Sequence, residues 1–551
     1  MKLALVGALC LAVTVACSPG YDLVIRNGEV IDGTGAPPRR ADLAVRDGRI
    51  VAIGSVSGRA REEIDAAGRV VAPGFIDVQG QSGATLLADG NGDSHIRQGI
   101  TTEIIGEGGT PALWTGGHAD DASIQRFNLK VDWTSFDGFL RALEKKGTSI
   151  NLGSFVPVAM LREQVMGMAD RRASAEELKQ EQAILERAMQ QGSFGFATAL
   201  IYPPASYTTT EELIELAKVA AKHGGVYISH VRGESFRVKE AIAEAIQIGQ
   251  QAALPVVIYH LKIGAKANWG HMADIRRLIE EAQARGLNVT ACQYPYTAGG
   301  TGLQATLPGW AQEGGREAML ARLADPAQRA KMRHDIEANT EVENLLAGAT
   351  FEGVQIASVP ADKDQSIVGK RLSEIAAARH QDNWDTLFAV LRENEGRVGA
   401  LYHMMAEDDV KEAMRFPWVS VGTDSAAIKP DGELGRGQPH PRSYGTFPRI
   451  LGRYVREQQV LTLPEAIRKM TSLAASQMKI PERGTLREGY FADIVIFDPK
   501  IVADTATFEQ PHQYPVGIDT VIVNGMVTVS HGTHTGAHAG RALYGPGYKN
   551  K

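Results

Sequence analysis

The chain has 551 residues, a formal net charge of −6 and a hydrophobic fraction of 44%. This length and apolar content suffice for several domains, or for one large barrel with a satellite domain. The mild acidity and the lack of a basic stripe in the sequence argue against a nucleic-acid partner.

Residues 1–17 are typical of a bacterial export signal. Lys2 precedes the apolar run LALVGALCLAVTVA, which is too short to span a bilayer comfortably and ends at a small residue. The ending TVAC is also similar to a lipoprotein box, with Cys17 as the lipidated residue. Cleavage near Ala16 without a lipid is the alternative. We therefore expect an exported, periplasmic protein whose contact with a membrane, if it has one, is a lipid on Cys17.

Both ends of the mature chain predict β-strands. Alternating apolar residues broken by Asn-Gly and Asp-Gly pairs occur early, in YDLVIRNGEVIDGTG and ADLAVRDGRIVAIG, and late, in GYFADIVIFDP and IDTVIVNGMVTVSHG. We expect residues 21–72 and 487–551 to form one small β-sandwich domain, with the middle of the chain inserted between its two parts.

Residues 73–486 alternate strand-like and helical segments. Eight strand-like runs end at GFIDVQGQ, TTEIIGEGG, INLGSFVP, SFGFATAL, GVYISHV, PVVIYHLK, NVTACQYPY and WVSVGTDS. Helical text separates most of them, such as TTTEELIELAKVAAKHGG, which opens with a capping box from Thr209 to Glu212. The alternation predicts an α/β protein with a parallel sheet, and eight repeats predict closure into a (β/α)8 barrel. The span from about 298 to 415 is longer than one crossover, so it holds an insertion.

The reactive side chains of this predicted barrel fall at the carboxyl ends of its strands, where such barrels place their active sites. Glu107 follows the second strand, His230 ends the fifth, His260 ends the sixth and Asp424 ends the eighth. Zinc favours histidine nitrogen and carboxylate oxygen, and catalytic zinc sites use three protein ligands plus water. Glu107, His230 and His260 are therefore the predicted zinc ligands. Asp424 is the predicted catalytic group that takes a proton from the attacking water and passes it to the leaving group.

Several segments together resemble the D-aminoacylase (N-acyl-D-amino-acid deacylase) branch of the amidohydrolase superfamily. They are VVAPGFID, GITTEIIGEGG, YISHVRGES, YHLKIGAKANWG, YPYTAGGTGL, VGTDS and HPRSYGTFPR. The resemblance covers nearly the whole mature chain. It implies a deformed barrel that carries one or two zinc ions and hydrolyses an amide.

The sequence departs from this family at the metal positions. Most relatives end the first strand in His-x-His, which holds one metal, whereas this chain has Gln79 and Gln81 there. An amide oxygen binds zinc far more weakly than imidazole does, so we expect that site to be lost and one zinc ion to bind per chain. His230 and His260 match the ligands of the other site directly. The family ligand on the second strand is a cysteine one place after Glu107, so Glu107 is either its replacement or an acid behind the ligands.

The resemblance implies an N-acyl amino acid as substrate, in this branch an N-acyl-D-amino acid, cleaved to a carboxylate and a free amino acid. The free carboxylate of such a substrate requires a cation or several donors. The candidates for substrate binding are Lys262, Tyr202, Tyr294, Arg436, Arg442, Gln79 and Gln81. A structural role is the alternative for each of them. A cyclic amidase or dipeptidase on the same barrel, and a nonhydrolytic periplasmic binding protein, are the alternative functions.

Overall fold

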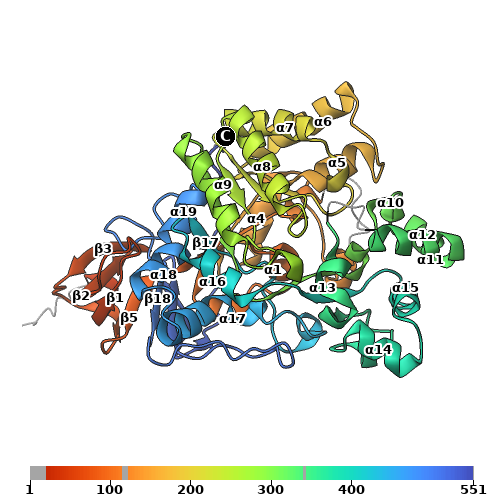
Figure 1. Cartoon of the computed structure of the whole chain (residues 1–551). Coiled ribbons are helices and arrows are strands. Elements are labelled where there is room, and N and C mark those ends of the chain that lie inside the picture. Colours follow the sequence, from red (N-terminus) through yellow and green to blue (C-terminus); the bar gives the residue numbers. More distant parts are fainter. Residues whose placement is uncertain (1–19, 115–121, 339–342, 550–551) are drawn as a thin grey trace, which may run out of the picture.

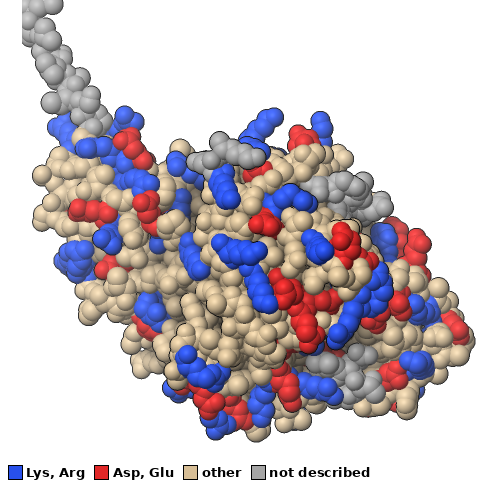
Figure 2. All heavy atoms as spheres, turned by 90° about the horizontal axis from the view of Figure 1, so that it is seen from above, with Lys and Arg blue, Asp and Glu red and all other residues tan. Residues whose placement is uncertain are grey.

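The computed structural model describes residues 20–114, 122–338 and 343–549 (Figure 1). The predicted export signal, including Cys17, lies outside these residues. None of the helices in this part of the chain combines the length and the apolar character needed to cross a bilayer. Acidic and basic side chains are interspersed over the face of the molecule seen in Figure 2.

A parallel barrel forms the centre of the described chain, and its strands follow one another in sequence order. The strands are β6 (Phe75–Asp77), β7 (Ile100–Ile105), β8 (Asn151–Ser154) continued by β9 (Val156–Pro157), β10 (Gly195–Ala199), β11 (Val226–His230), β12 (Val256–Ile258), β13 (Val289–Gln293) and β17 (Val419–Val421). Hydrogen bonds join β6-β7-β8 and β9-β10-β11-β12-β13-β17. A parallel bridge between Gly80 and Ser425 connects the chain after β6 to the chain after β17. The predicted (β/α)8 fold is confirmed.

Amphipathic helices cover the outside of the barrel. The crossovers after β9 to β12 contain α5 (Val158–Met166), α6 (Ala175–Gln190), α7 (Thr210–Lys222), α8 (Val238–Ala252) and α9 (Met272–Ala284), and α6 to α9 lie side by side (Figure 1). The predicted capping box starts α7, because the Thr209 and Glu212 side chains each bind the other's backbone N–H. Leu213 and Leu216 of α7 are fully buried, as the 3.6-residue period requires.

Shorter helices surround the remaining strands. Between β6 and β8 lie α1 (Gly83–Ala88), α2 (Asp93–Ile96), α3 (Ala122–Phe127) and α4 (Phe136–Lys146). After β17 come α17 (Arg442–Arg449), a π-helical turn at Ile450–Glu457, α18 (Leu463–Met470) and α19 (Ser472–Met478). The first crossover therefore has little regular helix.

Strands from both chain ends form one small β domain. They are β1 (Tyr21–Val30), β2 (Arg39–Arg46), β3 (Arg49–Gly54), β4 (Ala60–Asp65), β5 (Val70–Pro73), β18 (Ile494–Phe497), β19 (Ile518–Val523), β20 (Met526–Ser530) and β21 (Thr533–His534). Antiparallel pairing of β5 with β18 joins the two ends, which lie side by side in Figure 1. Leu23, Leu43, Ile494 and Ile522 share its apolar core. The prediction that both ends build one small β domain is confirmed.

The insertion between β13 and β17 has its own sheet and core. β14 (Ala298–Gly302), β16 (Gly399–His403) and β15 (Val354–Ser358) pair antiparallel in that order. Its helices are α10 (Gly309–Gln312), α11 (Gly315–Ala324), α12 (Pro326–Glu337), α13 (Leu345–Gly353), α14 (Leu372–Arg379), α15 (Asn383–Glu393) and α16 (Glu407–Arg415). Helices α11 to α15 lie across the barrel from the small β domain (Figure 1). The sheet of this insertion brings β14 and β16 to the mouth of the barrel.

Candidate metal and substrate site

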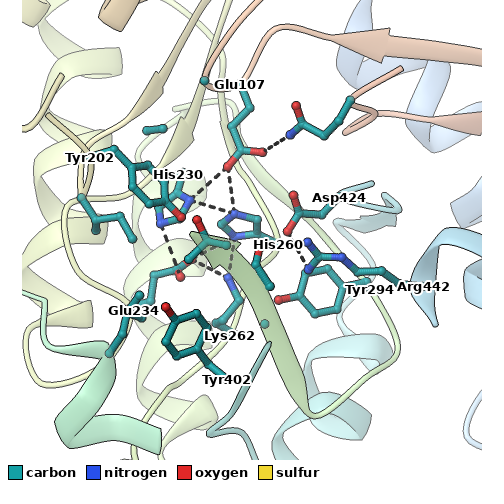
Figure 3. Close-up of a pocket in the computed structure, with 18 of the residues that line it drawn as sticks. Glu107, Tyr202, His230, Glu234, His260, Lys262, Tyr294, Tyr402, Asp424 and Arg442 are labelled. Carbon is teal, nitrogen blue, oxygen red and sulfur yellow. Dashed lines mark hydrogen bonds and ion pairs between the residues drawn. The ribbon is translucent and has the colours of Figure 1, made fainter. Parts of the chain in front are cut away.

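A cavity of about 240 Å³ lies where the carboxyl ends of the barrel strands meet the insertion. The barrel side contributes Glu107, His230, His260, Lys262 and Asp424. The insertion covers the cavity with residues from β14, α13 and the end of β16, namely Gly299, Gly300, Thr301, Leu345, Tyr402 and Met404. Reactive side chains from distant parts of the sequence therefore share one cavity (Figure 3).

Three potential metal ligands point toward one another in this cavity (Figure 3). Glu107 Oε1 lies 3.0 Å from His230 Nδ1 and 3.1 Å from His260 Nε2, and the two nitrogens lie 3.0 Å apart. Ligands held about 2.0–2.1 Å from a tetrahedral zinc ion lie roughly 3.3 Å from one another. The donor set is one that zinc prefers, and a movement of roughly 0.3 Å would fit it to the ion.

The second oxygen of Glu107 is bound by two glutamines that follow the first strand, β6. Nε2 of Gln79 and Nε2 of Gln81 each donate to Glu107 Oε2 over 2.8 Å. Burial alone would raise the pKa of Glu107, but the neighbouring His260 and His230 rings hold it well below its usual range. Glu107 is therefore an anion with one oxygen toward the histidines and the other toward strand β6.

Glu234 bridges the far sides of both histidines. Its Oε1 lies 2.9 Å from His260 Nδ1 and 2.6 Å from Lys262 Nζ, and its Oε2 lies 3.5 Å from His230 Nε2. Burial and Lys262 lower the pKa of His260, but the Glu234 and Glu107 carboxylates outweigh them and raise it to about 9. A carboxylate on the far nitrogen of a ligand histidine fixes the ring and increases its basicity. Glu234 was not predicted from the sequence, since it lies in a loop four residues beyond the strand-ending His230.

Asp424 lies on the other side of the cavity, beside a cation. Arg442 Nη1 is 2.8 Å from Asp424 Oδ2, and the Arg442 guanidinium lies 4.6 Å from the centre of the Tyr294 ring. Burial raises the pKa of Asp424, while Arg442 opposes that rise. Asp424 adopts a left-handed backbone (φ 50°), and its N–H donates to the Gln79 carbonyl over 2.8 Å. Such backbone strain, about 1–3 kcal/mol, concentrates at functional sites.

A fully buried network of Asp77, His95 and Glu103 supports the loops beneath the cavity. Asp77 accepts hydrogen bonds from the backbone N–H groups of Gln79 and Thr423. Glu103 accepts from the backbone and hydroxyl of Ser82 and from His95. The closely spaced donor atoms of this cluster are thus occupied by protein groups, so its role is to position the segments that carry Gln79, Gln81 and Asp424.

The structure brings most of the predicted substrate-binding residues to the cavity. Lys262, Tyr202, Tyr294 and Gln81 line it. Gln79 is buried behind the lining, with its amide engaged by Glu107. Arg436, by contrast, does not line the cavity as predicted. A 3-10 turn at Gly432–Gly435 precedes it, and its half-exposed side chain pairs with Glu433 three residues back, at 2.9 Å.

Arg442 is the cation that the segment after β17 supplies to the cavity. The glycine-rich stretch AGGTGLQATLP at the start of the insertion is typical of a loop at the barrel mouth, and its Gly299, Gly300 and Thr301 line the cavity. Leu345 and Tyr402, which later parts of the insertion contribute, were not predicted.

The chain is similar to known amidohydrolases over nearly its whole length. The model of the Amidohydrolase family matches residues 62–529. A D-aminoacylase of Alcaligenes xylosoxydans xylosoxydans is 36% identical over 96% of this chain and 98% of its own length. The crystal structure of an N-acyl-D-glutamate deacylase from Bordetella bronchiseptica, complexed with zinc and a phosphonate mimic of the tetrahedral intermediate, is 32% identical with a TM-score of 0.80 and covers 95% of this chain and 99% of that one.

A D-aminoacylase structure is similar to the same degree. It is 35% identical with a TM-score of 0.79, and the match covers 95% of this chain and 100% of that one. That protein is described with a binuclear metal centre in which one metal activates and a second attenuates.

Proposed function

The chain belongs to the amidohydrolase family, and we propose that it is a metal-dependent enzyme that hydrolyses N-acyl-D-amino acids to a carboxylate and a free D-amino acid. One observation carries this proposal. A single cavity holds a carboxylate–histidine–histidine ligand set, the strained Asp424 and two cations, Lys262 and Arg442. Solved and curated relatives of matching length are deacylases of this kind.

Zinc is the metal that the donors fit, and we propose one ion per chain. Glu107 Oε1, His230 Nδ1 and His260 Nε2 would hold it. When bound there, zinc supplies Lewis acidity for the acyl carbonyl and a water that is acidic enough to attack near neutral pH. Glu234 keeps the His260 imidazole oriented by binding its far nitrogen at 2.9 Å, and it lies 3.5 Å from the far nitrogen of His230.

Asp424 is the residue that moves protons in this reaction. Its carboxylate lies in the cavity, and a base so placed accepts the proton of the attacking water and returns it to the amine nitrogen as the C–N bond breaks. Proton transfer of this kind contributes about 10²–10⁴-fold to the rate. Arg442 favours the ionised form of Asp424, so it keeps the carboxylate ready to accept that proton.

The free carboxylate of the substrate binds between the two cations. Lys262 Nζ lies 5.6 Å, and the Arg442 guanidinium 4.6 Å, from the centre of the same Tyr294 ring. Burial lowers the pKa of Lys262, but the Glu234 carboxylate outweighs this effect and the net pKa is raised, so Lys262 remains a cation at neutral pH. Two cations and the neighbouring tyrosine hydroxyl form a recognition site for one anion.

The rest of the cavity wall selects an uncharged substrate side chain and acyl group. Ile201, Leu345 and Met404 provide apolar lining. Lys262 and Arg442 are the cations among the described lining residues, and the substrate's α-carboxylate uses both. We therefore expect N-acetyl-D-leucine and N-acetyl-D-methionine to be better substrates than N-acetyl-D-glutamate.

A substrate panel tests the proposal. The zinc-loaded protein is incubated with N-acetyl-D- and N-acetyl-L-amino acids, a hydantoin and a dipeptide, and the released amine is measured. We expect release from the neutral N-acetyl-D-amino acids. Turnover of the hydantoin or dipeptide alone, or no turnover of any compound by zinc-loaded protein, would refute it.

We also propose that the protein is exported to the periplasm, which the pattern of residues 1–17 supports. Cell fractionation tests the location. Labelling with a fatty-acid analogue, compared between the unaltered chain and Cys17→Ala, tests the lipid.

A further inference from the structure

We propose that Gln79 and Gln81 are positioning residues, which hold Glu107 as a one-oxygen metal ligand and close the position beside it to a second metal ion. This inference rests on the zinc site of the proposed function, but not on the identity of the substrate. It gives a role to two neutral amides that lie where a metal site would otherwise be expected.

The orientation of both amides follows from the chemistry of their partner. Gln79 Nε2 and Gln81 Nε2 lie 2.8 Å from the same atom, Glu107 Oε2. An ionised carboxylate only accepts hydrogen bonds, so both side chains must present their NH₂ groups to it. Because an amide NH₂ group has no lone pair to offer, the atoms that face Glu107 from the first strand cannot bind a metal ion.

A second contact fixes the Gln79 amide in that orientation. The Cys292 thiol donates to Gln79 Oε1 over 3.4 Å, so the oxygen of this amide is held on the side away from Glu107. Gly422 leaves room for the side chain, since a Cβ there would lie 2.8 Å from Gln79 Cβ. Gln79 is 1% exposed and cannot turn toward solvent.

The two carboxylate oxygens of Glu107 therefore have different partners. Oε2 receives two hydrogen bonds to a charged acceptor, which are stronger than bonds between neutral groups. Oε1 lies 3.0 Å from His230 Nδ1 and 3.1 Å from His260 Nε2. The carboxylate is thereby oriented before a metal arrives, and one oxygen only is directed at the metal position.

Zinc affinity, measured without substrate, tests the positioning role. Gln79→Met and Gln81→Met keep most of the side-chain volume but remove the donors. The matched control is Gln293→Met, which removes a buried amide whose Nε2 donates to the Val410 carbonyl, away from Glu107. Competition with a chromophoric chelator gives the dissociation constant of zinc for each protein.

We expect the zinc dissociation constant to rise by about 10–100-fold in each of the two variants, the usual effect of losing a partner of a metal ligand. The zinc dissociation constant of the control should stay within about twofold of that of the unaltered chain, because the Gln293 side chain does not contact a metal ligand. Unchanged zinc affinity in both variants would overturn the inference. If the buried Gln79 variant does not fold, the partly exposed Gln81 variant decides the question alone.

Metal stoichiometry tests the closed second position. We expect the unaltered chain to bind one equivalent of zinc at saturation, and the double variant with Gln79→His and Gln81→His to bind two. Two tightly held ions in the unaltered chain would overturn the inference. Failure of the deacylase proposal has a different signature, because the protein would then bind zinc as described and still release no amine from any N-acyl-D-amino acid.

Discussion

Replacement of Glu234 by glutamine tests how much a carboxylate behind the proposed metal ligands contributes to stability and to zinc binding. Glu234 is 4% exposed, and its carboxylate contacts three basic groups, His230, His260 and Lys262. Glutamine has nearly the same volume, so Glu234→Gln leaves no cavity. It removes one negative charge and places a donor where an acceptor stood.

The size of the effect follows from these contacts. The nearest cation, Lys262 Nζ, lies 2.6 Å from Glu234 Oε1, and removing one partner of a buried pair costs about 3–5 kcal/mol of stability. Loss of the carboxylate behind His260, 2.9 Å away, lowers zinc affinity by about 10–100-fold. That change corresponds to about 1.4–2.7 kcal/mol of binding free energy.

Two measurements check this prediction. Urea denaturation of the metal-free protein gives the loss of stability, and chelator competition gives the zinc dissociation constant. Glu212→Gln is the control, since Glu212 is a buried carboxylate that accepts hydrogen bonds from the backbone N–H groups of Thr209 and Ala173 instead of contacting a histidine. We expect the control to lose stability while keeping its zinc affinity. Equal zinc affinities in the two variants would show that Glu234 does not support the ligands.

Three further substitutions test the remaining groups. Asp424→Asn should lower kcat by about 10²–10⁴-fold with zinc still bound by elemental analysis, and near-normal turnover would remove Asp424 from the mechanism. Arg442→Met should reduce the preference for N-acetyl-D-leucine over its uncharged amide by roughly 10–100-fold, the value of a hydrogen bond to a charged group; an unchanged preference would place the carboxylate elsewhere. Burial raises the pKa of Glu181 to about 7, although Arg162 opposes the rise. The folded state therefore binds the Glu181 proton more tightly than the unfolded state does. The resulting stabilisation, on the order of 3 kcal/mol, is fully present below the unfolded pKa and is lost as pH rises through about 7. Glu181→Gln should lose less stability between pH 5 and pH 8 than the unaltered chain, and identical urea midpoints for the two proteins at both pH values would contradict that.

The fold could be predicted from sequence because its signals are local and repeated. The 3.6-residue period of α7 and its capping box from Thr209 to Glu212 specify one helix without reference to the rest of the chain. Repetition of strand and helix then leaves few topologies, since parallel strands require crossovers. The insertion was located by its length alone, because its sheet pairs β14 with β16 across nearly a hundred residues and no local pattern encodes that pairing.

The site could be predicted only as far as strand ends determine it. His230 ends a regular strand and Asp424 closely follows one, so their convergence at the barrel mouth follows from the parallel register. Glu234 lies in a loop, and its contact with both histidines depends on the path of that loop. The choice between Arg436 and Arg442 likewise depends on the turn at Gly432–Gly435, which directs the first arginine to the surface.

The balance of charge in the cavity explains why metal and substrate belong to one site. Without metal, its ionised side chains are the carboxylates of Glu107, Glu234 and Asp424 and the cations Lys262, Arg442 and His260, whose pKa is raised to about 9, so the charges balance. Zinc held by Glu107, His230 and His260 would replace the His260 proton and leave a net charge of +1, which one substrate carboxylate would neutralise. Charge buried in a low-dielectric cavity is stable only when it is balanced, so the metal-free cavity disfavours the anionic substrate that the zinc-loaded cavity accepts. Zinc held by Glu107, His230 and His260 would therefore favour binding of the substrate carboxylate through the charge of the cavity.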